Sequence, residues 1–159
     1  RVPTKPEVSS TSAELLTFAI GNVTDDSATV VLSWDKVRVP FTVKVKDVVA
    51  ATLGHLREFV AAADANDPGA PLAAGSYAKA NKRDSEANIW FEMALKRSEA
   101  KVAQRETLKD LAQQATILAN LGRKADAVKA AERGVFVGKA AKEDTSNLEK
   151  QIEKWKLTS

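Results

Sequence analysis

Hydrophobic and polar residues alternate with a period of two in the first third of the chain, and this pattern predicts β-strands. The clearest run is 37–45, where the apolar residues share one face and most residues of the other face are polar or basic. Runs at 15–20 and 28–35 alternate in the same way and are separated by turn residues. Asp35 and Lys36 leave room only for a tight hairpin before the last run. We therefore expect three half-buried antiparallel strands.

A sheet of three strands with one apolar face is an incomplete structure. It needs a covering layer, and its open edges invite pairing with another strand. Pro40 cannot donate a hydrogen bond, so the third strand should lie at an edge or carry a bulge there. We favour missing strands over a cover of helices, because the segment at Arg1, Val2 and Pro3 starts abruptly and is typical of the tail of another strand or connector.

The hydrophobic period becomes helical after Asp47, which is a suitable N-cap for a helix with apolar residues at 49, 53, 56, 60 and 63. Gly122 fits a C-cap, and Ser146 with Glu149 forms a capping box. We expect five further helices, at about 69–80, 84–98, 105–121, 123–140 and 146–157.

Two stretches of the helical part share a spacing of small residues. A small residue is followed twelve positions later by alanine and seven positions after that by another small residue, at Gly75, Ala87, Ala94 and at Ala115, Ala127, Gly134. This spacing predicts antiparallel helix pairs whose backbones approach closely. With the bulky Phe91 one turn after Ala87, the first copy resembles the tetratricopeptide repeat. The second copy departs from that repeat, since Ala131 stands at the bulky position.

A wider resemblance covers most of residues 13–157. The segments 26–34 and 37–41, the segment 117–123 (ILANLGR) and the ending around Trp155 are similar to the second half of a bacterial domain family of unknown function, number 2911. The resemblance implies an exported bacterial protein, periplasmic or lipid-anchored, with a β-rich domain and a helical tail. It implies no activity. The family's earlier β segment is not in this chain, in agreement with an incomplete sheet.

Composition narrows the classes of function. The chain of 159 residues is 44% hydrophobic and 28% charged, with a net charge of +3, as in ordinary globular proteins. Basic residues are interleaved with acidic ones, as in 96–106, which argues against nucleic-acid binding. No apolar run reaches the roughly 20 residues that span a bilayer. Cysteine is absent, which excludes disulfides, and the first residue is Arg, so we expect a processed or trimmed chain.

Candidate chemistry is sparse. His55 is the only histidine. With Glu58 it forms one possible pair of metal ligands, but a dimetal site needs a second such pair, so we expect His55 to be a packed or half-exposed helical residue. Asp25 and Asp26 stand among turn residues, where aspartate side chains commonly accept hydrogen bonds from the nearby backbone, so we expect them to be turn residues rather than a catalytic pair. We therefore expect no catalytic residues and no cofactor.

Asp64, Asn66 and Gly69 imitate the start of a calcium loop. Pro68 occupies a ligand position and Gly75 stands where the bidentate glutamate belongs, so the calcium interpretation fails and no metal is expected. The same segment contains the signals that end one helix and begin the next, which is a sufficient explanation.

Glycines and aromatic residues suggest packing and one candidate surface. The spacing of Gly134 and Gly138 predicts close packing of two helices, since neighbouring charges exclude a membrane span. The three tryptophans, at 34, 90 and 155, are most simply core residues. Tyr77 and Trp90 are nevertheless the two aromatic residues that we would test for binding a peptide in a helical groove.

Together these features predict an α+β protein. A small antiparallel sheet, part of a β-sandwich, should occupy residues 1–46, and a tetratricopeptide-like array of helical hairpins residues 47–159. We expect a non-enzymatic interaction or scaffold protein of the bacterial cell envelope, with a protein or peptide partner and an extracytoplasmic location.

Two alternatives remain open. The chain could belong to an enzyme or small-ligand binder whose site lies mainly in an absent β segment and borrows His55 or Arg38. It could also self-associate or pair with another chain through its open sheet edges.

Overall fold

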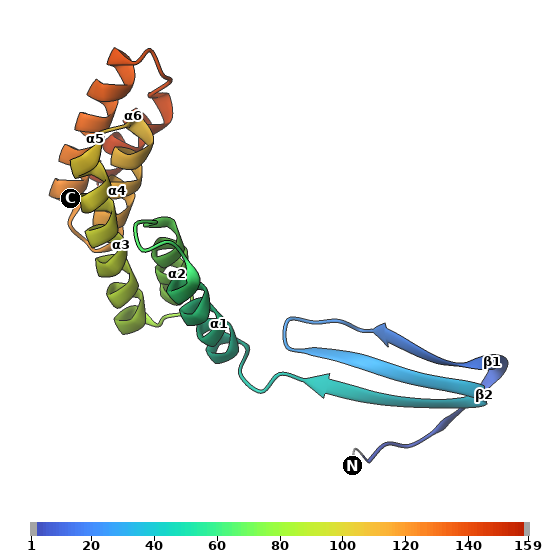
Figure 1. Ribbon diagram of the computed structural model, residues 1–159. Coiled ribbons are helices and arrows are strands. Elements are labelled where there is room, and N and C mark those ends of the chain that lie inside the picture. Colours follow the sequence, from blue (N-terminus) through green and yellow to red (C-terminus); the bar gives the residue numbers. More distant parts are fainter. Residues whose placement is uncertain (1–2, 158–159) are drawn as a thin grey trace. The chain divides into compact units, whose positions relative to one another are not determined.

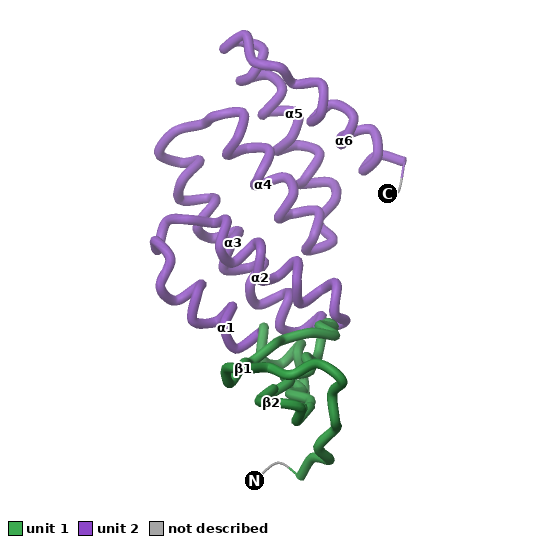
Figure 2. Tube along the Cα trace, turned by 90° about the vertical axis from the view of Figure 1, so that its right-hand side faces the viewer, with its two compact units in different colours: residues 1–52 green, residues 53–159 purple. Residues whose placement is uncertain are grey.

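A computed structural model describes residues 3–157 and shows an α+β protein with a two-stranded antiparallel sheet and six helices in that part (Figure 1). The chain divides into two compact units, residues 1–52 and 53–159, and the division falls inside the first helix (Figure 2). The elements are β1 (Glu7–Gly21), β2 (Ser27–Lys44), α1 (Val48–Ala62), α2 (Gly69–Ala80), α3 (Asp84–Gln104), α4 (Leu108–Asn120), α5 (Lys124–Ala140) and α6 (Ser146–Leu157).

The strand β2 doubles back on itself. A straight strand of its 18 residues would span roughly 60 Å. The backbone N–H of Val45, just past its end, nevertheless donates to the carbonyl of Asp26, just before its start, at 2.7 Å. Asp35 has a φ of 50°, which is a turn conformation rather than an extended one. Figure 1 shows the ribbon of β2 reversing its direction along its length.

Residues 3–157 contain two strands where the sequence predicted three, because the turn predicted at Asp35 lies inside β2 and the second and third predicted runs are the two halves of that strand. The first strand is also longer than expected, because β1 begins at Glu7, and its pairing with β2 shifts register around Ala13. Pro40 lies inside β2, where its carbonyl accepts a hydrogen bond from the Thr4 hydroxyl. The abrupt start expected at Arg1 and Val2 lies outside the described residues.

The described part of the β unit has no buried residue, since every position from Pro3 to Thr52 is exposed or only half-buried. Trp34, predicted as a core residue, is 64% exposed, and Phe18 is 65% exposed. The prediction for Trp34 is wrong because, among the described residues of this unit, no second layer covers the face on which it lies. The described part of the β unit thus forms one sheet, and the β-sandwich stays a prediction.

The helices begin and end close to the predicted signals. Asp47 caps α1 by accepting the backbone N–H three residues later at 2.9 Å, and Gly122 ends α4 with a φ of +79°. The cap of α6 falls one residue before the predicted Ser146, because the carbonyl of Thr145 accepts the N–H of Glu149 at 3.0 Å. α3 continues to Gln104, six residues beyond its predicted end.

Small residues mark the places where helices meet, as the spacing predicted. Ala87, Ala115 and Ala127 are at most 1% exposed. A Cβ built on Gly75 of α2 would lie 2.6 Å from the ring of Phe91 on α3, which is itself fully buried. The close helix packing predicted for Gly134 and its partner glycine is confirmed in the same way, since α5 approaches α4 and α6 there.

The helical unit is arranged in two layers. In one layer α4 lies between α2 and α6, since Lys79 of α2 donates to the Asn120 carbonyl of α4 at 2.9 Å and Ala112 of α4 packs against the buried cluster that contains Leu148 of α6. In the other layer α3 and α5 meet through a buried cluster that contains Ala94 and Ala127. Figure 2 shows these helices following one another along the unit.

The approach of α2 to α3 yields a first prediction. Gly75→Ala should destabilise the helical unit by about 1–3 kcal/mol, because the new methyl would overlap a buried ring that has no room to move. The matched control is Gly54→Ala on α1, where a Cβ would meet nothing within 4 Å; this change should be neutral or stabilise the helix by up to about 1 kcal/mol. Urea unfolding followed by circular dichroism measures both, and equal effects at the two glycines would refute the packing argument.

Candidate interaction surfaces of the helical unit

A groove lies between α4 and α6, on the layer that these helices share with α2. Its volume is about 340 Å³. The apolar part is formed by Leu108 and Ala112 of α4 and by Leu148 of α6, which all belong to or pack on one buried cluster. Because these side chains are anchored in the core, the groove is part of the fold rather than a gap between mobile loops.

The rim of this groove is polar. Thr116 of α4 faces Asn147 and Gln151 of α6, which are four residues apart and so lie on one side of that helix. Asp144 closes one end, and its carboxylate accepts the backbone N–H of Ser146 at 2.9 Å. That backbone hydrogen bond lowers the pKa of Asp144, so the carboxylate is charged at neutral pH. The groove thus offers apolar contact, uncharged donors and acceptors, and one negative charge.

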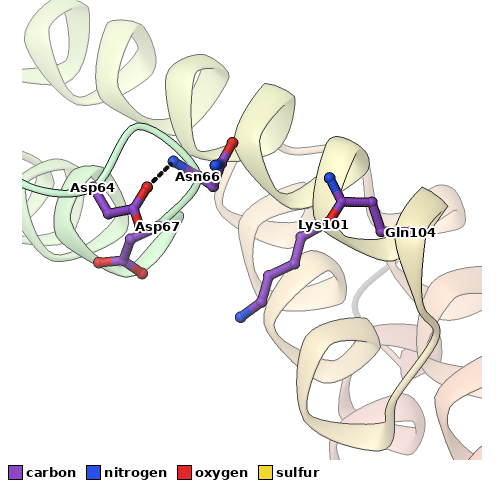
Figure 3. A pocket seen from close by; sticks show the side chains of 5 residues that line it. All are labelled: Asp64, Asn66, Asp67, Lys101 and Gln104. Carbon is purple, nitrogen blue, oxygen red and sulfur yellow. Dashed lines mark hydrogen bonds between the residues drawn. The ribbon is translucent and has the colours of Figure 1, made fainter.

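A second hollow, of about 240 Å³, lies between the α1–α2 loop and α3 (Figure 3). Its lining residues are Asp64, Asn66, Asp67, Lys101 and Gln104. The carboxylate of Asp64 accepts the N–H of Asn66 at 2.8 Å, and that of Asp67 accepts the N–H of Gly69 at 2.9 Å. The sequence that imitates a calcium loop is therefore the stop-and-start signal between two helices. No group of three or more histidine, aspartate or glutamate residues that could hold a metal occurs in the described part of the chain.

Lys101 in this hollow also joins α3 to α4. Its ammonium lies 2.9 Å from the carboxylate of Asp110, whose side chain is only 11% exposed. The hydroxyl of Thr107 donates to the same carboxylate at 2.7 Å. Burial raises the pKa of Asp110, but the hydrogen bonds from Lys101 and Thr107 outweigh it, and the net pKa lies below its usual value. The pair has a structural role that accounts for both residues.

Tyr77 and Trp90, the two candidate partner-binding residues, differ in exposure. Trp90 on α3 is 6% exposed and belongs to the core, whereas Tyr77 on α2 is half-buried. The α4–α6 groove contains neither of them. On the described helices, α3 instead exposes Ile89 and Met93, at 65% and 38%.

The structure also locates the polar residues that were considered for catalysis. His55 is 84% exposed at its side chain and lies 3.7 Å from Glu58, so it is more exposed than the packed or half-exposed residue that we expected. Arg38 of β2 lies at a separate polar hollow of about 280 Å³ that is lined mainly by serine and threonine and by Asp35. Asp25 and Asp26 occupy the bend between β1 and β2, as predicted, where Asp26 pairs with Lys44 at 3.3 Å.

Comparison with known proteins adds no relative. No protein-family profile, no curated protein and no solved structure matches this chain. Among the described residues, no helix is both long enough and apolar enough to cross a membrane. The candidate surfaces therefore have to be interpreted from their own chemistry.

The difference in burial predicts different responses of the two aromatic candidates. Trp90→Ala should lower the free energy of unfolding by about 3–5 kcal/mol, because it leaves a large cavity in the core. Tyr77→Ala should cost about 1–2 kcal/mol, since part of this ring already faces solvent. Thermal and urea unfolding of the two variants tests this, and a small loss for Trp90→Ala would show that its ring lies outside the core.

The Lys101–Asp110 pair predicts a dependence of stability on pH. Since the folded-state pKa of Asp110 is lowered, its contribution is present above the unfolded-state value of about 4 and is lost as the pH falls through the folded-state value. Asp110→Asn should therefore cost about 1–2 kcal/mol at pH 7, and this difference from the unmodified protein should shrink as the pH falls below the unfolded-state pKa and through the lowered folded-state pKa of Asp110. Urea titrations at several pH values measure it, with the exposed Glu99→Gln on α3 as the control. A loss for Asp110→Asn that stays constant with pH would contradict the assignment.

Proposed function

We propose that the protein is a non-enzymatic interaction or scaffold protein, and that its helical unit binds an extended peptide segment of a partner protein. The observation that carries this proposal is the α4–α6 groove, with its apolar floor at Leu108, Ala112 and Leu148 and its amide-bearing rim. Ligand sites are typically concave and mostly apolar, with a few polar groups that fix orientation.

The rim chemistry favours a peptide over a charged small molecule. The amides of Asn147 and Gln151 each carry both donors and acceptors, so they can pair with the N–H and C=O groups of a peptide backbone. Asp144 is the only charged residue among the groove's lining residues, and it is already engaged in the turn before α6. A phosphate or carboxylate ligand would need cationic partners that this lining does not offer.

The proposed arrangement is tetratricopeptide-like. In that interpretation α2 and α3 form one hairpin, α4 and α5 form the next, and α6 follows them as a final helix. The small residues buried between the paired helices support it, as does the layer shared by α2, α4 and α6, since stacked hairpins of this kind present an extended binding surface. The extracytoplasmic bacterial location is part of the proposal and is supported by the sequence resemblance alone.

A displayed library of random peptides tests the proposal. Peptides selected on the full chain should lose affinity by about tenfold or more when Asn147 and Gln151 are both changed to alanine, because the backbone hydrogen bonds are lost. The matched control is Lys150→Ala, an exposed position on the same helix that does not line the groove, and it should change the affinity less than about twofold.

Two results would contradict the proposal. One is a library that yields no binder to the folded chain. The other is a set of binders whose affinity responds equally to the rim variant and to the Lys150 control, which would place the peptide elsewhere on the surface.

A further inference from the structure

The β unit presents a continuous apolar face. Phe18 of β1 lies opposite Leu32 of β2, and Ile20 lies opposite Val30, so these four side chains share one side of the sheet. The alternation along each strand places Leu16 and Trp34 on the same side. The opposite side pairs Thr17 with Ser33 and Ala19 with Val31, and its side chains are smaller and more polar.

This apolar face is open to solvent within its unit. Leu16, Phe18, Ile20 and Trp34 are exposed to 58%, 65%, 72% and 64%. Phe and Trp side chains have about 150–250 Å² each, and with somewhat less for leucine and isoleucine these four side chains together expose on the order of 450 Å². The N–H of Val45 donates to the carbonyl of Asp26, so the two halves of β2 lie antiparallel and valines 37, 43 and 45 are on the same side as Trp34. These valines are exposed to 45%, 51% and 46% and bring the exposed apolar area of this face to roughly 700 Å².

An area of this size matches an interface. The largest apolar patch of a typical monomer is about 300–600 Å², whereas a stable protein–protein interface buries about 800 Å² on each partner. A two-layered β structure places its sheets about 10 Å apart with their apolar faces together. The β unit, which has no buried residue between Pro3 and Thr52, is one such layer.

The face is also complementary to itself. None of the nine side chains named on this face is charged, so two copies can meet without opposing like charges. A two-fold axis brings the same patch of each copy together and closes the assembly at two chains. Phe18 and Trp34 are the large aromatic anchors that such an interface needs.

We propose that two copies of this chain pack these apolar faces against each other and form a symmetric two-layered β-sandwich. The occupant of the face is therefore a second copy of the β unit, and the contact is made by sheet faces rather than by sheet edges. This assembly is independent of the peptide groove on the helical unit.

Single cysteines test the proposal directly, because the chain has no cysteine of its own. Ile20→Cys places a thiol on the apolar face, and Ala19→Cys places one on the opposite side of the same strand. Alkylation of the Ile20→Cys thiol by a maleimide should slow at least about tenfold as the protein concentration is raised through the dimer dissociation constant. Alkylation of the Ala19→Cys thiol should not change with concentration.

Solution mass gives the second measurement. Light scattering of the unmodified chain should give twice the mass of one chain. Phe18→Asp should raise the dissociation constant at least about a hundredfold, because a charge on each copy would be buried in the interface. The control Thr17→Asp lies on the opposite side and should leave the dimer intact. Both variants should keep the helical circular dichroism, which confirms that the helical unit is folded.

Four results would overturn the proposal. The first is a monomer at all concentrations, and the second is a series of larger assemblies. The third is protection of the Ile20→Cys thiol that does not vary with concentration, which would mean that the chain covers its own sheet. The fourth is equal protection of both thiols, which would indicate pairing through edges.

Discussion

Close contact between helices at glycines and alanines is the constraint on which the packing of the helical unit depends. A Cβ built on Gly134 of α5 would lie 3.0 Å from the side chain of Leu148 on α6. A Cβ built on Gly138 would lie 3.0 Å from the side chain of Leu108 on α4. These two leucines form much of the floor of the α4–α6 groove. The glycines of α5 therefore set the shape of a surface on the other layer, because close-packed interiors transmit a change in spacing directly.

Charged residues join the helices from outside this packed interior. Arg133 of α5 donates to Glu106 before α4 at 2.6 Å, Lys139 of α5 pairs with Glu149 of α6 at 2.7 Å, and Lys156 of α6 pairs with Glu132 of α5 at 2.9 Å. Each pair connects neighbouring elements and is largely exposed, so each contributes little energy alone. The pairs explain why a chain with 28% charged residues shows interleaved charges instead of a patch of one sign.

The helical unit could be predicted in detail from the sequence because its signals are local. Asp47 and Gly122 act within one turn of the chain, and the buried alanines repeat at a helical spacing. The groove could not be predicted, because it depends on which side of α6 faces α4. The only signal for it in the sequence was the pair Asn147 and Gln151, four residues apart and beside the apolar stripe. The prediction that Trp34 is buried was wrong for a similar reason, because its burial depends on a covering layer that no local sequence pattern specifies.

The β unit shows that an amphipathic pattern predicts which side chains share the apolar side of a sheet, but not which surface packs against that side. Hydrogen bonds join β1 to β2, and β2 returns on itself at Asp35, so the backbone of the sheet is largely satisfied within the unit. The apolar side chains of the sheet are not buried within the unit, because Phe18 and Trp34 remain about two-thirds exposed. Hydrogen bonds alone contribute little net energy, since an unfolded chain makes them with water, whereas the burial of apolar surface supplies most of the free energy that favours folding. In the proposed dimer, a second copy covers this face and supplies the burial that the β unit lacks by itself.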